Sequence, residues 1–121
     1  MIEVGGAKMH RVCFQLQVKH DLLVEYRTAH AAGWPELLQA IADSGRHNYS
    51  LFLREDGLLI GYYETESIGA SQAALAADPR TAAWEVTMAH FFVALDGRPD
   101  QNSLVLTEIF NLEQQLVKES P

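Results

Sequence analysis

The stretch NYSLFLREDGLLIGYYET, residues 48–65, decides the fold because it contains two strand-like runs joined by a tight turn. Leu, Ile, Phe and Tyr dominate both runs, residues 48–54 and 58–65, and these side chains suit a pleated, half-buried surface. Between them, Asp56-Gly57 is a turn dipeptide, since glycine adopts left-handed backbone conformations at little cost. The stretch therefore predicts a β-hairpin in the middle of the chain.

Helix signals flank this hairpin on both sides. Two helices are predicted before it, over residues 21–30 and 34–44, and two after it, over residues 67–77 and 78–92. Gly33 suits the end of the first helix, and Pro35 suits the first turn of the second. Ser67 and Asp78 have side chains that cap helix N-termini. The hairpin thus lies between two helical segments.

The outermost periodic segments predict two further strands. Apolar side chains alternate with mostly polar ones along residues 12–18, and residues 104–112 form a second strand-like run. The resulting order is strand, helices, strand, strand, helices, strand. We therefore expect an α+β fold of the ferredoxin-like split βαβ type, in which right-handed crossovers place all helices on one face of an antiparallel sheet.

The other face of this sheet would be uncovered in a monomer. The strands at residues 48–54 and 104–112 carry apolar side chains on both faces. A large exposed apolar surface usually marks an interface. We therefore expect a homodimer in which two sheets pack face to face, forming a dimeric α+β barrel.

Length and charge limit the organisation and the partners. The 121 residues suit one domain with a single core, for which we expect a flexible leader at residues 1–8, a domain at residues 9–112 and a C-terminal tail at residues 113–121. The formal net charge of −7 would repel nucleic acid and anionic membrane surfaces. We therefore expect no nucleic-acid or membrane partner.

Cysteine usage and hydropathy indicate the compartment. The single cysteine, Cys13, excludes an internal disulfide and a cysteine-rich metal site. No apolar run approaches the roughly 20 residues of a membrane span, and residues 1–8 lack the apolar core of a secretory signal. A cytoplasmic location is the expectation.

The candidate chemistry lies in residues 25–37. Tyr26 and His30 are four residues apart, a spacing that places both side chains on the same face of a helix. Trp34 follows after the break at Gly33. Histidine has an ordinary pKa of about 6.5 and can accept and return a proton near neutrality. The alternative is that these residues only pack at a helix–helix corner.

A metal or cofactor site is not indicated. The five histidines show no His-Glu-x-x-His or paired-His spacing, and no glycine pattern typical of nucleotide binding is present. The alternative for His47 is a hydrogen bond to backbone groups, and for His90 we expect burial with a hydrogen-bond partner on an apolar helix. We expect neither a metal ion nor a cofactor.

Four motifs in order resemble those of the L-rhamnose mutarotase family. They are Tyr26 and His30 followed by Trp34-Pro35-Glu36-Leu37, then His47-Asn48-Tyr49, then Trp84 with Met88, and the Pro- and Asn-containing loop at residues 96–103. The resemblance covers residues 9 to about 112. The first motif is the most specific, and the others support it by their order.

The resemblance implies a cofactor-free isomerase that interconverts the α and β anomers of L-rhamnose. It assigns proton donation to His30 and sugar binding to Tyr26, Tyr49 and Trp84. The family has a second tryptophan after Trp84, where this chain has Glu85. The preferred sugar is therefore open, and Glu85 is a candidate for contacting it.

The residue types fit this chemistry. Tyrosine hydroxyls can donate to or accept from sugar hydroxyls, and the flat faces of Trp84 and Trp34 suit the C–H surface of a sugar. The general base stays open among Tyr26, Glu36 and a bound water. Because one fold hosts unrelated functions, an oxygenase-like enzyme or a ligand-binding module without catalysis is the alternative.

Overall fold

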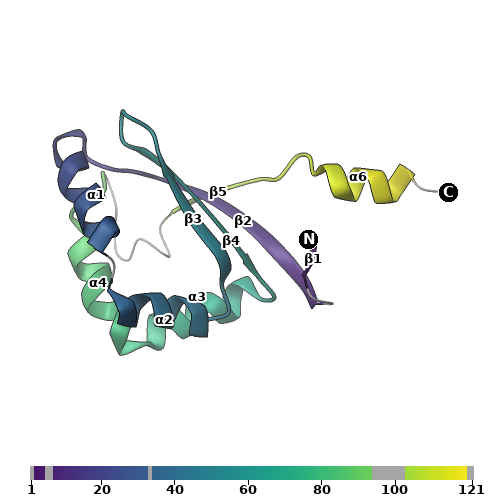
Figure 1. Ribbon diagram of the computed structural model, residues 1–121, viewed down its shortest axis with the longest axis horizontal. Helices are drawn as coiled ribbons and strands as arrows, with labels where there is room; N and C mark the ends of the chain where they lie inside the picture. Colours follow the sequence, from purple (N-terminus) through teal and green to yellow (C-terminus); the bar gives the residue numbers. More distant parts are fainter. Residues whose placement is uncertain (1, 5–6, 33, 94–102, 120–121) are drawn as a thin grey trace.

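The computed structural model describes residues 2–4, 7–32, 34–93 and 103–119, which form a sheet, four helices against it and a separate C-terminal helix (Figure 1). The strands are β1 (Ile2–Val4), β2 (Ala7–Gln17), β3 (His47–Leu53), β4 (Leu58–Thr65) and β5 (Leu104–Leu106). The helices are η1 (His20–Leu22), α1 (Leu23–Ala32), α2 (Pro35–Asp43), α3 (Ile68–Ala77), α4 (Pro79–Ala89) and α6 (Leu112–Glu119).

The sheet has the predicted ferredoxin-like connectivity. β2 and β4 pair along residues 10–17 and 58–65, β3 pairs with β4 as a hairpin, and β5 pairs with β2, all antiparallel. Helices α1 and α2 lead from β2 to β3, and α3 and α4 lead from β4 towards β5. The predicted α+β class and split βαβ order are therefore confirmed.

The turn glycine and the two helix caps lie where the sequence predicted them. Gly57 has a φ of +96° in the hairpin turn, and a side chain there would come 2.4 Å from the backbone oxygen of Val18. The Ser67 side chain accepts a hydrogen bond from the Ala70 N–H, and that of Asp78 accepts one from the Arg80 N–H. These contacts satisfy backbone donors at the first turns of α3 and α4.

Two predicted elements are shorter in the structure. Helix α4 ends at Ala89 and not at Phe92, because the side chains of Phe91 and Phe92 are buried in the core. The backbone of residues 91 and 93 hydrogen-bonds to Lys19 and Gln17, at the end of β2. Strand β5 ends at Leu106 and not at Leu112. In the register of β5, residues 110–112 would face Ala7–Met9 of β2, the segment with which β1 pairs.

Both ends of the chain contain elements that were not predicted. β1 lies inside the predicted leader and pairs with Ala7–Met9 of β2, and all of α6 except Leu112 lies in the predicted tail. Figure 1 shows α6 projecting away from the sheet and the other helices. The division at residues 9 and 112 stays a prediction. No helix in the described ranges is long and apolar enough to cross a bilayer.

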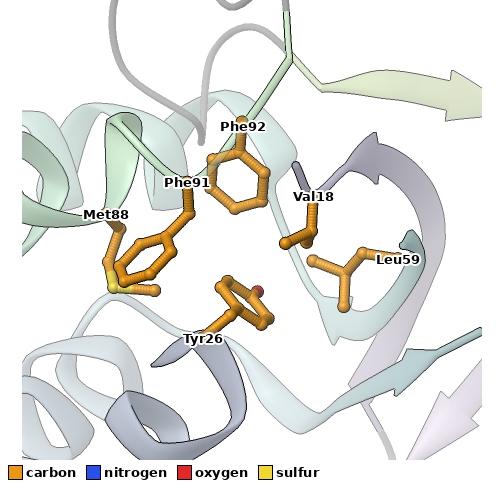
Figure 2. Packing of buried hydrophobic residues seen from close by; sticks show 6 residues of the cluster. All are labelled: Val18, Tyr26, Leu59, Met88, Phe91 and Phe92. Atoms are coloured by element: carbon orange, nitrogen blue, oxygen red, sulfur yellow. The ribbon is translucent and has the colours of Figure 1, made fainter. Parts of the chain in front are cut away.

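The core lies between the sheet and the helices. Its larger cluster contains Val18, Tyr26, Leu59, Met88, Phe91 and Phe92, as Figure 2 shows. Along β4, Leu59, Gly61, Tyr63 and Thr65 are buried, whereas the alternate residues are partly exposed on the outer face. A buried face of period two is what a strand under helices requires.

Candidate active site

A cavity of about 190 Å³ lies between the helix-facing side of the sheet and the helices. Its wall combines apolar side chains with a few polar ones, which is the usual composition of a small-molecule site. Five of the six predicted site residues line it: Tyr26 and His30 from α1, Tyr49 from β3, and Trp84 and Glu85 from α4. The elements on which these residues lie are distant in sequence and meet only in the folded chain.

His30 is half-buried and held by its own helix. Its Nδ1 lies 3.3 Å from the backbone oxygen of Tyr26, four residues earlier. A carbonyl oxygen only accepts, so in this hydrogen bond Nδ1 carries the proton and Nε2 of the neutral ring has the lone pair. The ring also contacts Tyr26, with centroids 4.4 Å apart, and Trp84, with centroids 5.6 Å apart.

Burial sets the protonation states of the two α1 residues. Burial lowers the pKa of His30, although the hydrogen bond to the Tyr26 carbonyl acts in the opposite direction. Burial, and secondarily the neighbouring Tyr49, raises the pKa of Tyr26 well above its ordinary value. Near neutrality His30 is therefore a neutral base, and Tyr26 is a neutral hydroxyl.

Trp34 occupies a second layer. It is the N-cap residue of α2 and does not line the cavity, but its ring meets that of Trp84 edge to face with centroids 4.9 Å apart. Trp84 thus contacts Trp34 on one side and His30 on the other. Trp34 therefore packs against Trp84 on the side away from the cavity and, contrary to the prediction, does not line the candidate sugar site.

The other histidines and the candidate base Glu36 lie elsewhere. His47, His90 and Glu36 are exposed and do not line the cavity. His90 was expected to be buried, but it follows the last turn of α4, where its Nδ1 contacts the Thr87 carbonyl at the surface. Within the described residues, no three His, Cys, Asp or Glu side chains gather as metal ligands do.

Sequence reasoning missed polar and aromatic residues on the sheet side of the cavity. Arg46, immediately before β3, and Tyr63 on β4 both line it. Tyr63 could have been found from its alternation with the outward residues of β4, but nothing local distinguishes Arg46 from a surface arginine. Of the motif loop at residues 96–103, only Ser103 is described, and it lines the cavity.

Two sequence comparisons with known proteins indicate the same family. The sequence model of the L-rhamnose mutarotase family matches residues 11–112. An L-rhamnose mutarotase from Pectobacterium atrosepticum is 32% identical over 108 residues, which are 87% of this chain and 100% of that protein.

Solved structures are similar over most of their length. An L-rhamnose mutarotase from Formosa agariphila has a TM-score of 0.68 and 25% identity, covering 85% of this chain and 98% of that one. A putative antibiotic biosynthesis monooxygenase from Nitrosomonas europaea has a TM-score of 0.58 and 13% identity, covering 86% and 93%. The second likeness is one of fold alone.

Proposed function

The chain belongs to the L-rhamnose mutarotase family, and on this premise we propose that His30 moves the proton through which the bound sugar changes anomer. The protein is an isomerase that interconverts the α and β anomers of L-rhamnose. We assign the site to one cavity because four of the predicted residues line it: Tyr26, His30, Tyr49 and Trp84.

The reaction requires one proton to change oxygens. His30 Nε2 takes the proton of the anomeric hydroxyl while the bond between the anomeric carbon and the ring oxygen breaks. The resulting imidazolium returns this proton to the ring oxygen, leaving an open-chain aldehyde. Rotation exposes the other aldehyde face, and closure reverses the two transfers. His30 thus acts as base and then as the proton donor that the family resemblance implies.

The hydrogen bond at Nδ1 supports this role of Nε2. It fixes the ring orientation and the tautomer of the neutral imidazole, while the lowered pKa keeps that form available at neutral pH. Tyr26 is a poor candidate for the base, because its raised pKa keeps the phenol protonated. Glu36 lies outside the cavity wall.

We assign sugar binding to Tyr26, Tyr49, Trp84 and Glu85. The hydroxyls of Tyr26 and Tyr49 bind sugar hydroxyls, and the Trp84 ring packs against an apolar face of the sugar. Glu85 accepts a hydrogen bond from a further hydroxyl. Trp34 supports Trp84 from behind through its edge-to-face contact.

The test is saturation transfer between anomeric protons of L-rhamnose, measured by NMR. His30→Ala should lose the catalysed exchange, which for a positioned proton transfer is about 10²- to 10⁴-fold. His90→Ala is the matched control, because the Nδ1 of that histidine also contacts a backbone carbonyl but the residue lies outside the cavity. Near-wild-type exchange in a folded His30→Ala protein would contradict the assignment of proton transfer to His30. A wild type that binds the sugar without accelerating exchange would indicate a binding module.

We further propose that the protein acts as a homodimer in the cytoplasm. The outer face of the sheet supports the dimer, since Phe52 and Leu104 on it are 64% and 61% exposed. Cell fractionation would test the location. No cofactor enters the mechanism proposed for His30.

A further inference from the structure

Arg46 is a buried cation beside the candidate sugar site. Its side chain is 4% exposed and lines the cavity, although it belongs to the loop that leads into β3. Gly45, directly before it, has a φ of +89°, a left-handed conformation that turns the chain at this point. A guanidinium is costly to bury unless polar or aromatic groups receive it.

Two contacts fix the plane of this guanidinium. Its Nε donates to the Ser71 hydroxyl oxygen at 3.2 Å, and that hydroxyl donates to the Ile68 carbonyl at 3.0 Å. The guanidinium carbon also lies 4.1 Å from the centre of the Tyr63 ring, within the range of a cation–π interaction. Ser71 and Tyr63 are themselves buried, so the contact is largely shielded from water.

Tyr63 connects Arg46 to Tyr49, the candidate sugar-binding residue. Its ring lies parallel to that of Tyr49, with an interplanar angle of 6° and centroids 5.7 Å apart. Phe14 contacts both rings at 6.2 Å. Such offset stacking is a preferred arrangement of aromatic side chains. The plane of Tyr49, and with it the direction of its hydroxyl, is therefore coupled to the position of Tyr63.

We propose that Arg46 is a positioning residue that orients the sugar-binding hydroxyl of Tyr49 through the ring of Tyr63. The proposal rests on the proposed function only in treating Tyr49 as a sugar ligand. Arg46 then contributes to the Michaelis complex without taking part in the proton transfer at His30. Its loss should raise KM and leave kcat nearly unchanged.

The first test follows the tyrosine rings directly and needs no activity. The chain has four tyrosines, so ring-labelled tyrosine gives four sets of NMR signals that Tyr→Phe variants can assign. Arg46→Met, which keeps an apolar stem, should shift the signals of Tyr49 as well as Tyr63. Arg54→Met is the control, since Arg54 is an exposed arginine that follows β3 and pairs with Asp56. Unchanged Tyr49 signals in Arg46→Met would overturn the proposal.

The second test uses anomer exchange. Arg46→Met should raise KM about fivefold to tenfold, the size expected for a shielded cation–π contact. In a Tyr49→Phe background the same substitution should change KM by less than about twofold, because there is no hydroxyl left to orient. An equal rise in both backgrounds would mean a merely structural role and would overturn the proposal.

Conservative variants keep the test decisive if Arg46→Met folds poorly. Arg46→Lys retains the charge but loses the planar stack and the Nε hydrogen bond, so KM should lie between those of wild type and Arg46→Met. In a Tyr63→Leu background, which lacks the aromatic ring, Arg46→Met should raise KM by less than about twofold, whereas a rise as large as that in the wild type would contradict the stacking route. If the wild type fails to exchange anomers, the proposed function fails, and the NMR test still decides whether Arg46 orients Tyr49.

Discussion

Burial gives His30 and Tyr26 opposite roles although they lie one helical turn apart. The histidine becomes a more weakly basic, neutral imidazole, and the tyrosine becomes a more firmly protonated hydroxyl. Each group is thereby kept in one state near pH 7. A site that needs a proton acceptor beside a hydrogen-bond donor obtains both from a single helix face.

The lowered pKa of His30 predicts the pH dependence of the reaction. The neutral ring predominates above its ordinary pKa of about 6.5 and is lost only as the pH falls through a lower value. We expect kcat/KM for anomer exchange to be flat from about pH 8 to 6.5 and to fall on the acid side. His90→Ala should retain this profile. A rate that rises as the pH falls below 6.5 would mean that imidazolium starts the cycle.

Glu85 predicts an effect on sugar preference. If its carboxylate accepts from a sugar hydroxyl, Glu85→Gln should weaken binding about tenfold, because a charge-assisted hydrogen bond is stronger than a neutral one. Glu85→Trp should favour L-rhamnose over L-mannose, which carries one more hydroxyl. Exchange rates for L-rhamnose, L-fucose and L-mannose measure this. An unchanged order of preference in Glu85→Trp would show that Glu85 does not set specificity.

At the scale of elements, side-chain contacts join neighbouring helices and neighbouring strands. Arg80 at the start of α4 binds Asp78 and also reaches Asp43 of α2, at 2.7 and 3.0 Å. Gly61 of β4 lets the Phe14 ring lie against the strand, since a Cβ there would come 2.1 Å from that ring. The first contact joins α4 to α2 and the second packs β2 against β4, so each acts within one of the two layers between which the cavity lies.

The N-cap of α3 predicts a measurable contribution to stability. Ser67→Ala removes the 3.1 Å hydrogen bond to the Ala70 N–H and should lower the free energy of unfolding by about 1 kcal/mol. Urea unfolding followed by circular dichroism measures the change. Ser67→Asp keeps an acceptor and should remain near wild type. Equal losses in both variants would argue against capping as the cause.

At the scale of the whole molecule, none of the helices in the described part of the chain covers the outer face of the sheet (Figure 1). Partner residues in the sheet register place Leu106 beside Cys13, Leu104 beside Gln15 and Phe52 beside Ile60 on this face. This is the surface through which a second copy would pack. Phe52, Leu104 and Leu106 are exposed on this face, and exposed apolar side chains are what the dimer proposal requires.

Light scattering at low micromolar concentration tests the dimer. The wild type should have about twice the 13.5 kDa mass of one chain. Leu104→Glu should lower the mass towards that of a monomer, because an unpaired charge in an apolar interface is costly. Val86→Glu, at an exposed position of α4, should remain dimeric. A wild-type mass near 13.5 kDa would rule out the dimer.

Local chemistry was sufficient to predict the elements that begin and end at turns and caps. The strand expected at residues 58–65 coincides with β4, and Ser67 and Asp78 cap the helices that they were expected to cap. The shared helix face of Tyr26 and His30 follows from their spacing. These features depend on neighbours within a few residues, so the sequence alone specifies them.

The cavity wall, in contrast, depends on contacts between distant parts of the chain. Tyr49 and Trp84 were expected there only through a family resemblance, Trp34 lies in a second layer, and Arg46 was not expected at all. The extent of β5 depends on how far it pairs along β2, which is three residues, Cys13–Gln15. Strand register and helix packing decide these positions, because they bring together side chains whose separation in sequence carries no local signal.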